Sequence, residues 1–92
     1  MNDLKKYLPL GSVVMLKNGQ HRVMINGYCA KTEEREELFD YIGCMYPEGI
    51  FTLDSAMVFD HDDIKEVIFM GLADDEFKAF EKKLKELVNK EG

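Results

Sequence analysis

The sequence predicts an α+β fold: a small curled antiparallel sheet, or a partly open barrel, with one C-terminal amphipathic helix packed on it. Three observations support this fold class. Short β-rich runs separated by turn residues occupy residues 12–70. The spacing of these runs leaves no room for the crossover helices that a parallel sheet requires. Residues 74–90 contain no glycine or proline and carry their apolar residues on a single helical stripe.

Length and composition predict one domain, residues 1–92, with a modest core. The net charge of −6 disfavours nucleic-acid binding, because that affinity rests largely on Lys and Arg displacing counterions from phosphates. No apolar run approaches the roughly 20 residues that span a bilayer. No apolar signal-peptide core follows Lys5 and Lys6. We therefore expect a cytoplasmic protein that contacts no membrane.

The amino-terminal part of the chain predicts a lead-in and two strands. In residues 1–10 we expect one helical turn, ended by the proline at position 9. The apolar run within Ser12–Lys17 is typical of a buried strand. Asn18 and Gly19 then predict a type I′ hairpin turn. The second strand is expected at Arg22–Ala30, with a bulge or sharp bend at Gly27.

A charge run, a central strand and a short strand follow. Lys31–Glu36 is interpreted as a solvated loop, with a helical turn capped by Thr32 as the alternative. Leu38–Met45 carries large apolar residues on both faces, which predicts a central or strongly curved strand. Pro47–Gly49 predicts a turn, and Ala56–Phe59 a short strand.

The last strand is expected at Ile64–Met70 and ends at Gly71. It follows a turn, and Asp63 and Glu66 have the spacing of a capping box. The final helix is predicted to begin after Asp74, whose carboxylate can cap it. Burial of its apolar stripe predicts that Phe80→Ala costs about 3–5 kcal/mol. The stripe consists of Phe77, Phe80, Leu84, Leu87 and Val88.

The sequence shows no catalytic constellation, and we expect no enzyme activity, cofactor or small-molecule substrate. Asp60–Asp63 is the best candidate metal site, because carboxylates and an imidazole ligate divalent cations. Adjacent residues point in different directions, so a turn is favoured there and no metal is expected. Cys29 and Cys44 lie in predicted strands and are expected to be buried, reduced thiols. His21 is expected to face solvent.

Three residues are candidates for binding a protein partner. Tyr7 and Tyr46 each lie next to a proline-bearing turn, and tyrosine is favoured at interfaces. The alternative is that both rings pack under their own turns. Met45 belongs to a set of strand methionines that would form a binding surface if exposed on one face, and would otherwise fill the core.

Two blocks of strand and turn residues carry a resemblance. They are Tyr7-Leu8-Pro9-Leu10-Gly11-Ser12-Val13-Val14 and Asp40-Tyr41-Ile42-Gly43-Cys44 with Tyr46-Pro47-Glu48-Gly49. Together they resemble a small uncharacterised domain family of Gram-positive bacteria, encoded beside type VII secretion systems and their LXG toxins. The resemblance implies a non-enzymatic adaptor, a targeting chaperone that binds the amino-terminal region of the toxin. The alternative is an immunity protein that neutralises a toxin domain, for which an acidic surface suits a basic toxin.

Overall fold

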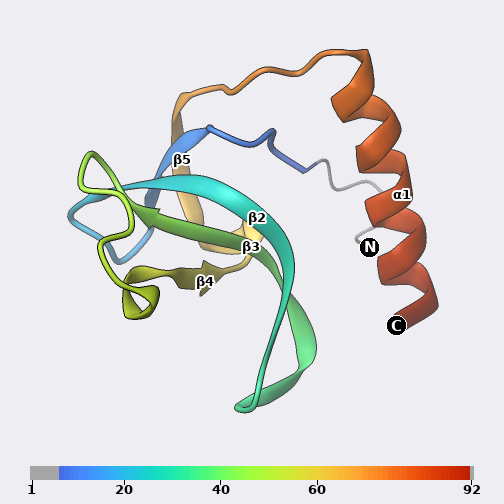
Figure 1. Ribbon diagram of the computed structural model, residues 1–92, viewed down its shortest axis with the longest axis horizontal. Helices are drawn as coiled ribbons and strands as arrows, with labels where there is room; N and C mark the ends of the chain where they lie inside the picture. Colours follow the sequence, from blue (N-terminus) through green and yellow to red (C-terminus); the bar gives the residue numbers. More distant parts are fainter. Residues whose placement is uncertain (1–6, 92) are drawn as a thin grey trace.

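The computed structural model describes residues 7–91 and shows a five-stranded antiparallel sheet followed by one long helix (Figure 1). The sheet order is β4-β3-β2-β1-β5. The sheet curls without closing into a barrel, so the predicted α+β class is confirmed. The elements are β1 (Val13–Leu16), β2 (Arg22–Thr32), β3 (Arg35–Met45), η2 (Leu53–Ser55), β4 (Met57–Phe59), η3 (His61–Asp63), β5 (Ile64–Phe69) and α1 (Asp75–Glu91).

The connection between β1 and β2 contains Asn18 and Gly19, as expected, but the predicted type I′ turn is wrong. Neither residue has the positive φ that such a turn requires. The loop covers residues 17–21, and the Gly19 N–H donates to the Leu16 carbonyl at 3.1 Å. A two-residue turn at Asn18 and Gly19 would extend β1 to Lys17, but β1 ends at Leu16.

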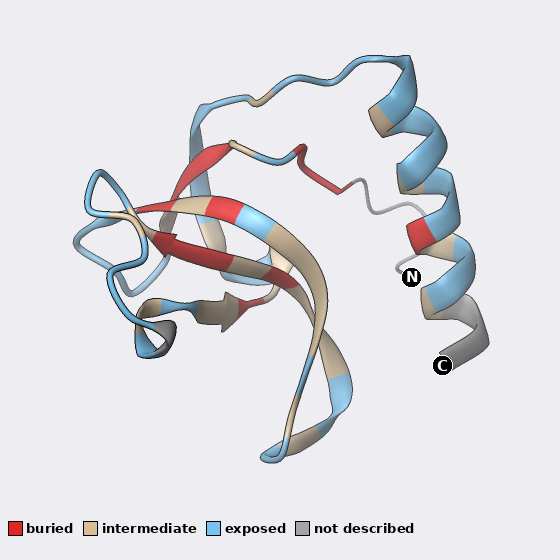
Figure 2. Ribbon diagram, viewed as in Figure 1, coloured by how far each residue is buried: buried red, intermediate tan, exposed pale blue. Residues whose placement is uncertain are grey.

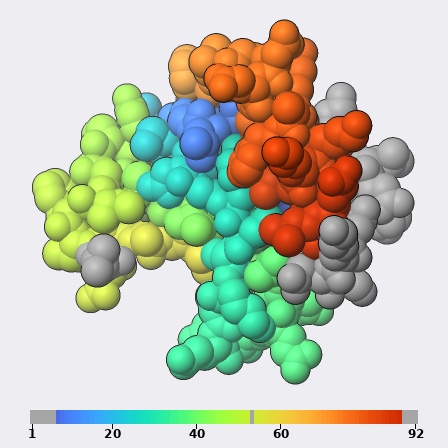
Figure 3. Space-filling view, turned by 45° about the vertical axis from the view of Figure 1, so that its right-hand side comes forward, coloured from blue at the N-terminus to red at the C-terminus, as the bar shows by residue number. Residues whose placement is uncertain are grey.

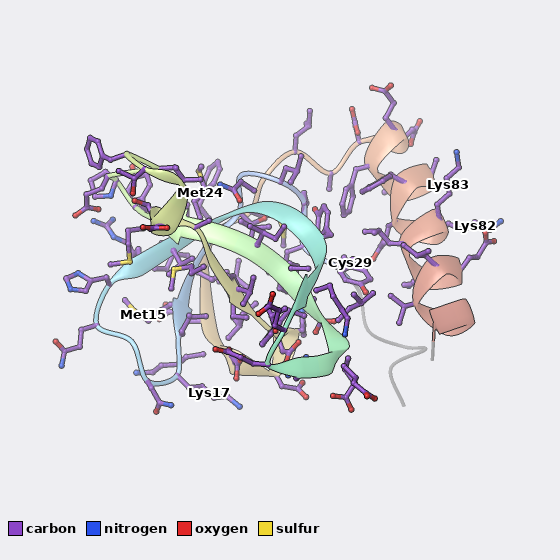
Figure 4. The ribbon with its side chains drawn as sticks, turned by 60° about the horizontal axis from the view of Figure 1, so that its bottom comes forward. Met15, Lys17, Met24, Cys29, Lys82 and Lys83 are labelled. Carbon is purple, nitrogen blue, oxygen red and sulfur yellow. The ribbon has the colours of Figure 1, made fainter. Side chains whose placement is uncertain are left out.

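The bulge expected near Gly27 is confirmed. The ladder between β2 and β3 skips Asn26, which lies between the paired residues Ile25 and Gly27. One extra residue shifts the alternation of side chains, so Tyr28 lies on the same side of the sheet as Ile25. Cys29 then has a φ of 58°, and Figure 4 labels it on the curved part of β2.

The charge run after β2 is a strand hairpin, so both the predicted loop and the alternative helical turn are wrong. β2 continues to Thr32, β3 begins at Arg35, and only positions 33–34 form the turn. Two contacts of the Arg35 guanidinium stabilise this hairpin. The guanidinium forms an ion pair with Asp60 at 2.9 Å and lies 3.8 Å from the centroid of the Phe39 ring.

The core lies inside the curl of the sheet (Figure 2). Its buried residues are Tyr7, Leu8, Val14, Val23, Ile25, Tyr41, Phe59 and Leu84. The rings of Tyr7, Tyr28 and Tyr41 contact one another with centroids 5.7–5.9 Å apart. Residues 7–9 are not helical, and the rest of the predicted lead-in turn lies outside the described residues.

Helix α1 begins where the sequence predicts. The Asp74 carboxylate accepts a hydrogen bond from the Phe77 N–H at 2.9 Å, which confirms the cap. The predicted burial of the whole apolar stripe is wrong. Leu84 is 5% exposed, whereas Phe80 and Leu87 are 47% and 45% exposed. The expected loss of 3–5 kcal/mol for Phe80→Ala therefore does not apply, because that range belongs to buried side chains.

The incomplete burial of α1 has a structural cause. Residues 7–9 lie between the helix and the sheet, where the Tyr7 N–H donates to the Glu81 carboxylate at 2.9 Å. The Leu8 N–H donates to the Tyr41 hydroxyl at 3.0 Å. Tyr7 and Leu8 are both buried, so they fill space that the helix stripe was expected to occupy.

Candidate functional site

The exposed edge of β5 carries an apolar surface. β5 ends the sheet and pairs with β1 on one side. Four consecutive residues, Val67 to Met70, are between 41% and 61% exposed. Leu10 and Leu72 on adjoining segments are 55% and 77% exposed. We call these six residues, Leu10, Val67, Ile68, Phe69, Met70 and Leu72, the apolar edge.

Two bulges in the β1–β5 ladder explain why this apolar run is exposed. Val13 and Val14 pair with Phe69 and Val67, so one residue of β5 is skipped between them. A second irregularity skips Lys65. A bulge interrupts the strict alternation between core and solvent and twists the strand. The side chains of β5 therefore do not form one buried face, and every residue from 65 to 69 is exposed.

The segment after β5 is held against the amino-terminal turn. The Gly71 N–H donates to the Ser12 hydroxyl at 3.0 Å, and that hydroxyl lies 3.9 Å from the Met70 sulfur. A Cβ added at Gly71 would collide with the Leu10 carbonyl oxygen. The two backbones are therefore in direct contact, and Figure 3 shows the two segments side by side on the surface.

Acidic residues lie at both ends of this surface. Of the chain's 18 acidic and 12 basic residues, seven acidic residues and one lysine lie in positions 60–76, which leaves 11 of each sign elsewhere. The whole net charge of −6 thus resides in this segment. The acidic side chains that are exposed are Asp62, Asp63, Glu66, Asp74, Asp75 and Glu76.

The opposite edge of the sheet is closed. β4 has three residues, and its last one, Phe59, is 3% exposed. The next residue, Asp60, accepts hydrogen bonds from the Arg35 guanidinium and the Asp40 N–H, each at 3.1 Å. Short strands and tied ends of this kind protect an edge against pairing. The accessible edge is therefore that of β5.

The predicted partner-binding residues do not form one surface. Tyr7 is 6% exposed and packs edge-to-face on Tyr28 of β2 and Tyr41 of β3, so its ring is buried against the strands. Tyr46 is 40% exposed in the turn after β3. Met45 is partly buried against the core. A role of these residues in binding stays a prediction, and for Tyr7 it would have to act through the fold.

The polar contacts around Leu8 are structural. Because the Tyr41 hydroxyl accepts the Leu8 N–H, its own proton can be donated to His61 Nδ1, 2.7 Å away. The Tyr28 hydroxyl donates to the Leu8 carbonyl at 2.5 Å. Burial raises the pKa of Tyr41, and burial with the nearby Glu81 raises the pKa of Tyr28 to about 12. The two hydroxyls bind both backbone groups of Leu8 and hold this residue in place.

The acidic turn is present but serves the fold. The predicted capping box of Asp63 and Glu66 is wrong, because Asp63 accepts the Asp60 N–H at 2.9 Å instead. Asp60 in turn forms an ion pair with Arg35. Within residues 7–91, no group of three or more His, Cys, Asp or Glu side chains is placed to hold a metal. The expectation of no metal stays a prediction.

The two cysteines differ in burial. Cys44 is buried in β3, as expected, whereas Cys29 is only half-buried in β2, so its predicted burial is wrong. Neither forms a disulfide. His21 is exposed in the loop before β2. Figure 4 also shows Lys82 and Lys83 pointing away from the sheet on the outer side of α1.

The sequence contained one signal that could have revealed the apolar edge. The apolar run 67–70 lies between two clusters of acidic residues. Acidic side chains normally face solvent, so this pattern is compatible with an exposed position of the run. Periodicity alone assigned the run to a strand and could not decide between an interior and an edge position. No helix within residues 7–91 is long and apolar enough to cross a membrane.

Comparison with known proteins identifies the domain. No curated protein and no solved structure matches the chain. One family model matches residues 7–80, which include all five strands and the first turns of α1. The expectation that the chain belongs to an uncharacterised domain family is therefore confirmed. Because the match covers more than half of the 92 residues, the protein belongs to the family described as domain of unknown function DUF4176.

Proposed function

We propose that this protein is a non-enzymatic cytosolic adaptor, and more specifically a targeting chaperone for an LXG toxin of a type VII secretion system. The observation that carries the binding role is the apolar edge. Six large apolar side chains exposed on one open strand and the segments beside it are a surface that monomeric proteins normally cover. The resemblance of residues 7–14 and 40–49 to proteins of type VII loci supports an LXG toxin as the partner.

The residues that carry the resemblance are mostly part of the scaffold, whereas the apolar edge is the surface proposed to bind. Leu8, Ser12, Val14 and Tyr41 are buried, and Leu8 is held by the hydroxyls of Tyr28 and Tyr41. These residues therefore build the scaffold. The apolar edge lies outside that scaffold and presents side chains that the core does not use, which suits a protein that acts by binding.

An immunity protein is the second candidate. Its support is the concentration of net charge in residues 60–76, because a basic toxin domain would be attracted to that side of the molecule. Both candidates share a protein partner, and they differ in which half of the toxin is bound.

Co-purification with the neighbouring toxin tests the proposal. The tagged protein is expressed with the full-length toxin, its amino-terminal secretion region, or its toxic carboxyl-terminal domain. We expect retention of the first two and loss of the third. Higher salt is expected to slow association more than dissociation, because long-range attraction acts on the encounter. Retention of the toxic domain alone, with rescue of growth, would replace the chaperone by the immunity protein. Retention of no fragment would remove both.

A further inference from the structure

We propose that the open edge of β5 binds an extended segment of the partner as a sixth strand, and that this segment has an apolar centre with Lys or Arg at both ends. The inference deepens the proposed function and rests on it in one respect, namely that the protein acts by binding another protein. It does not require the partner to be a toxin.

The backbone supports strand addition. β5 is six residues long and pairs with β1 alone among the strands of the sheet. An edge of this length offers unpaired N–H and C=O groups that an extended peptide can join. The other edge is too short and is followed by the Arg35–Asp60 ion pair. Strand addition is therefore directed to β5.

The side chains support an apolar centre. Because the bulges prevent β5 from forming one buried face, Val67, Ile68 and Phe69 are all exposed. An added strand projects its side chains alternately to the two faces of the sheet. It can therefore cover apolar neighbours on both faces at once. Phe69 is 61% exposed and is the aromatic residue of the apolar edge, so it is the expected anchor.

The charges select basic ends and argue against a second copy. The acidic clusters at 62–66 and 74–76 flank the apolar centre, so Lys or Arg at the ends of the bound segment would be attracted. In a symmetric dimer each partner presents the same surface. Pairing two β5 edges would bring together the segments that carry the −6 charge of each chain, which opposes association.

Three designed peptides provide the probe. The first is Lys-Lys-Val-Ile-Val-Ile-Val-Lys-Lys with a fluorophore, and the second has glutamates in place of all the lysines. A third carries N-methyl groups on alternate backbone amides and keeps the side chains. Binding to the intact protein is followed by fluorescence anisotropy. We expect the lysine peptide to bind at least about tenfold more tightly than either of the others, since charge and edge pairing are both required.

Matched variants locate the site. Phe69→Ser is expected to weaken binding of the lysine peptide about tenfold, whereas Phe51→Ser, at an 80% exposed side chain in the connection between β3 and β4, should leave it unchanged. Glu66→Gln with Asp62→Asn should reduce the salt dependence of binding, and Glu33→Gln with Glu34→Gln in the β2–β3 turn should not. Amide hydrogen exchange of the wild-type protein should show added protection in β5, which tests the site without any substitution.

Each contrary result is decisive. No binding of the lysine peptide, equal binding of the N-methylated peptide, or indifference to Phe69→Ser would overturn the inference. A dimer that depends on Phe69 would assign the edge to a second copy and overturn it too. If the amino-terminal toxin region binds the wild type and Phe69→Ser equally, the inference fails while the proposed function stands. If the peptide results hold but no toxin fragment is retained, the toxin chaperone fails and the edge site stands.

Discussion

The attachment of α1 can be tested by one substitution made at two positions of the same helix. Leu84 is 5% exposed and Leu87 is 45% exposed. Leu84→Ala removes a buried side chain, and such changes cost about 2–5 kcal/mol. We expect the lower half of that range, about 2–3 kcal/mol, because the partly exposed helix can move inward and reduce the cavity.

The same change at Leu87 should be far milder. About half of that side chain is already in water, so roughly half of the 1.5–3 kcal/mol for full burial is lost. The higher helix propensity of alanine offsets part of this loss. We therefore expect Leu87→Ala to cost about 0.5–1 kcal/mol. The two variants share the same helix and the same chemical change, so the difference reports burial alone.

Urea unfolding followed by circular dichroism measures both effects. For a domain of this size the free energy of unfolding falls by about 1–1.5 kcal/mol for each molar increment of urea. The midpoint of Leu84→Ala should therefore fall by roughly 2 M, and that of Leu87→Ala by less than about 1 M. Equal shifts, or a harmless Leu84→Ala, would show that α1 does not dock through Leu84 in solution.

The remaining predictions concern the tyrosine contacts and the turn after β5. Tyr41→Phe should cost about 1–3 kcal/mol in the same urea assay, because the buried Leu8 N–H loses its acceptor; an unchanged midpoint would contradict that hydrogen bond. Gly71→Ala should cost about 2 kcal/mol or more, because its Cβ would strike the Leu10 carbonyl oxygen; a neutral effect would contradict that close approach. Folding raises the pKa of Tyr28 from 10.0 to about 12. The unfolded chain therefore loses this proton first, and stability should be full below about pH 10 and fall as the pH rises towards 12. Melting temperatures across this range, with Tyr28→Phe as the control, would show a weaker decline in the variant.

Local signals in the sequence predicted local structure well. The cap at Asp74, the bulge near Gly27 and the positions of the strands outside residues 31–37 depend on a few neighbouring residues, and the structure confirms them. The type I′ turn failed although Asn18 and Gly19 are its preferred residues. The ladder between β1 and β2 ends at the pair Met15 and Arg22, which leaves a longer loop. The pairing register of β1 and β2 therefore determined the loop length, and the turn preference of Asn18 and Gly19 did not.

The errors about burial have a different origin. Val13–Leu16 and Val67–Met70 are similar apolar runs, yet the first lies between two strands and the second at an edge. Strand order is a property of the whole sheet, so periodicity within either run cannot reveal it. The burial of the apolar stripe of α1 was overestimated for the same reason. Its burial depends on where residues 7–9 lie, and these are distant from it in sequence.

The charge distribution connects the fold with the proposed role. An exposed apolar edge strand is a hazard, because it can pair with any other open edge. Acidic residues on both sides of the run reduce self-association, since each copy repels the same region of the next. The same residues would attract a segment with basic ends. One arrangement of side chains in residues 60–76 can thus keep the free protein monomeric and favour the partner, which is how specificity is obtained from both repulsion and attraction.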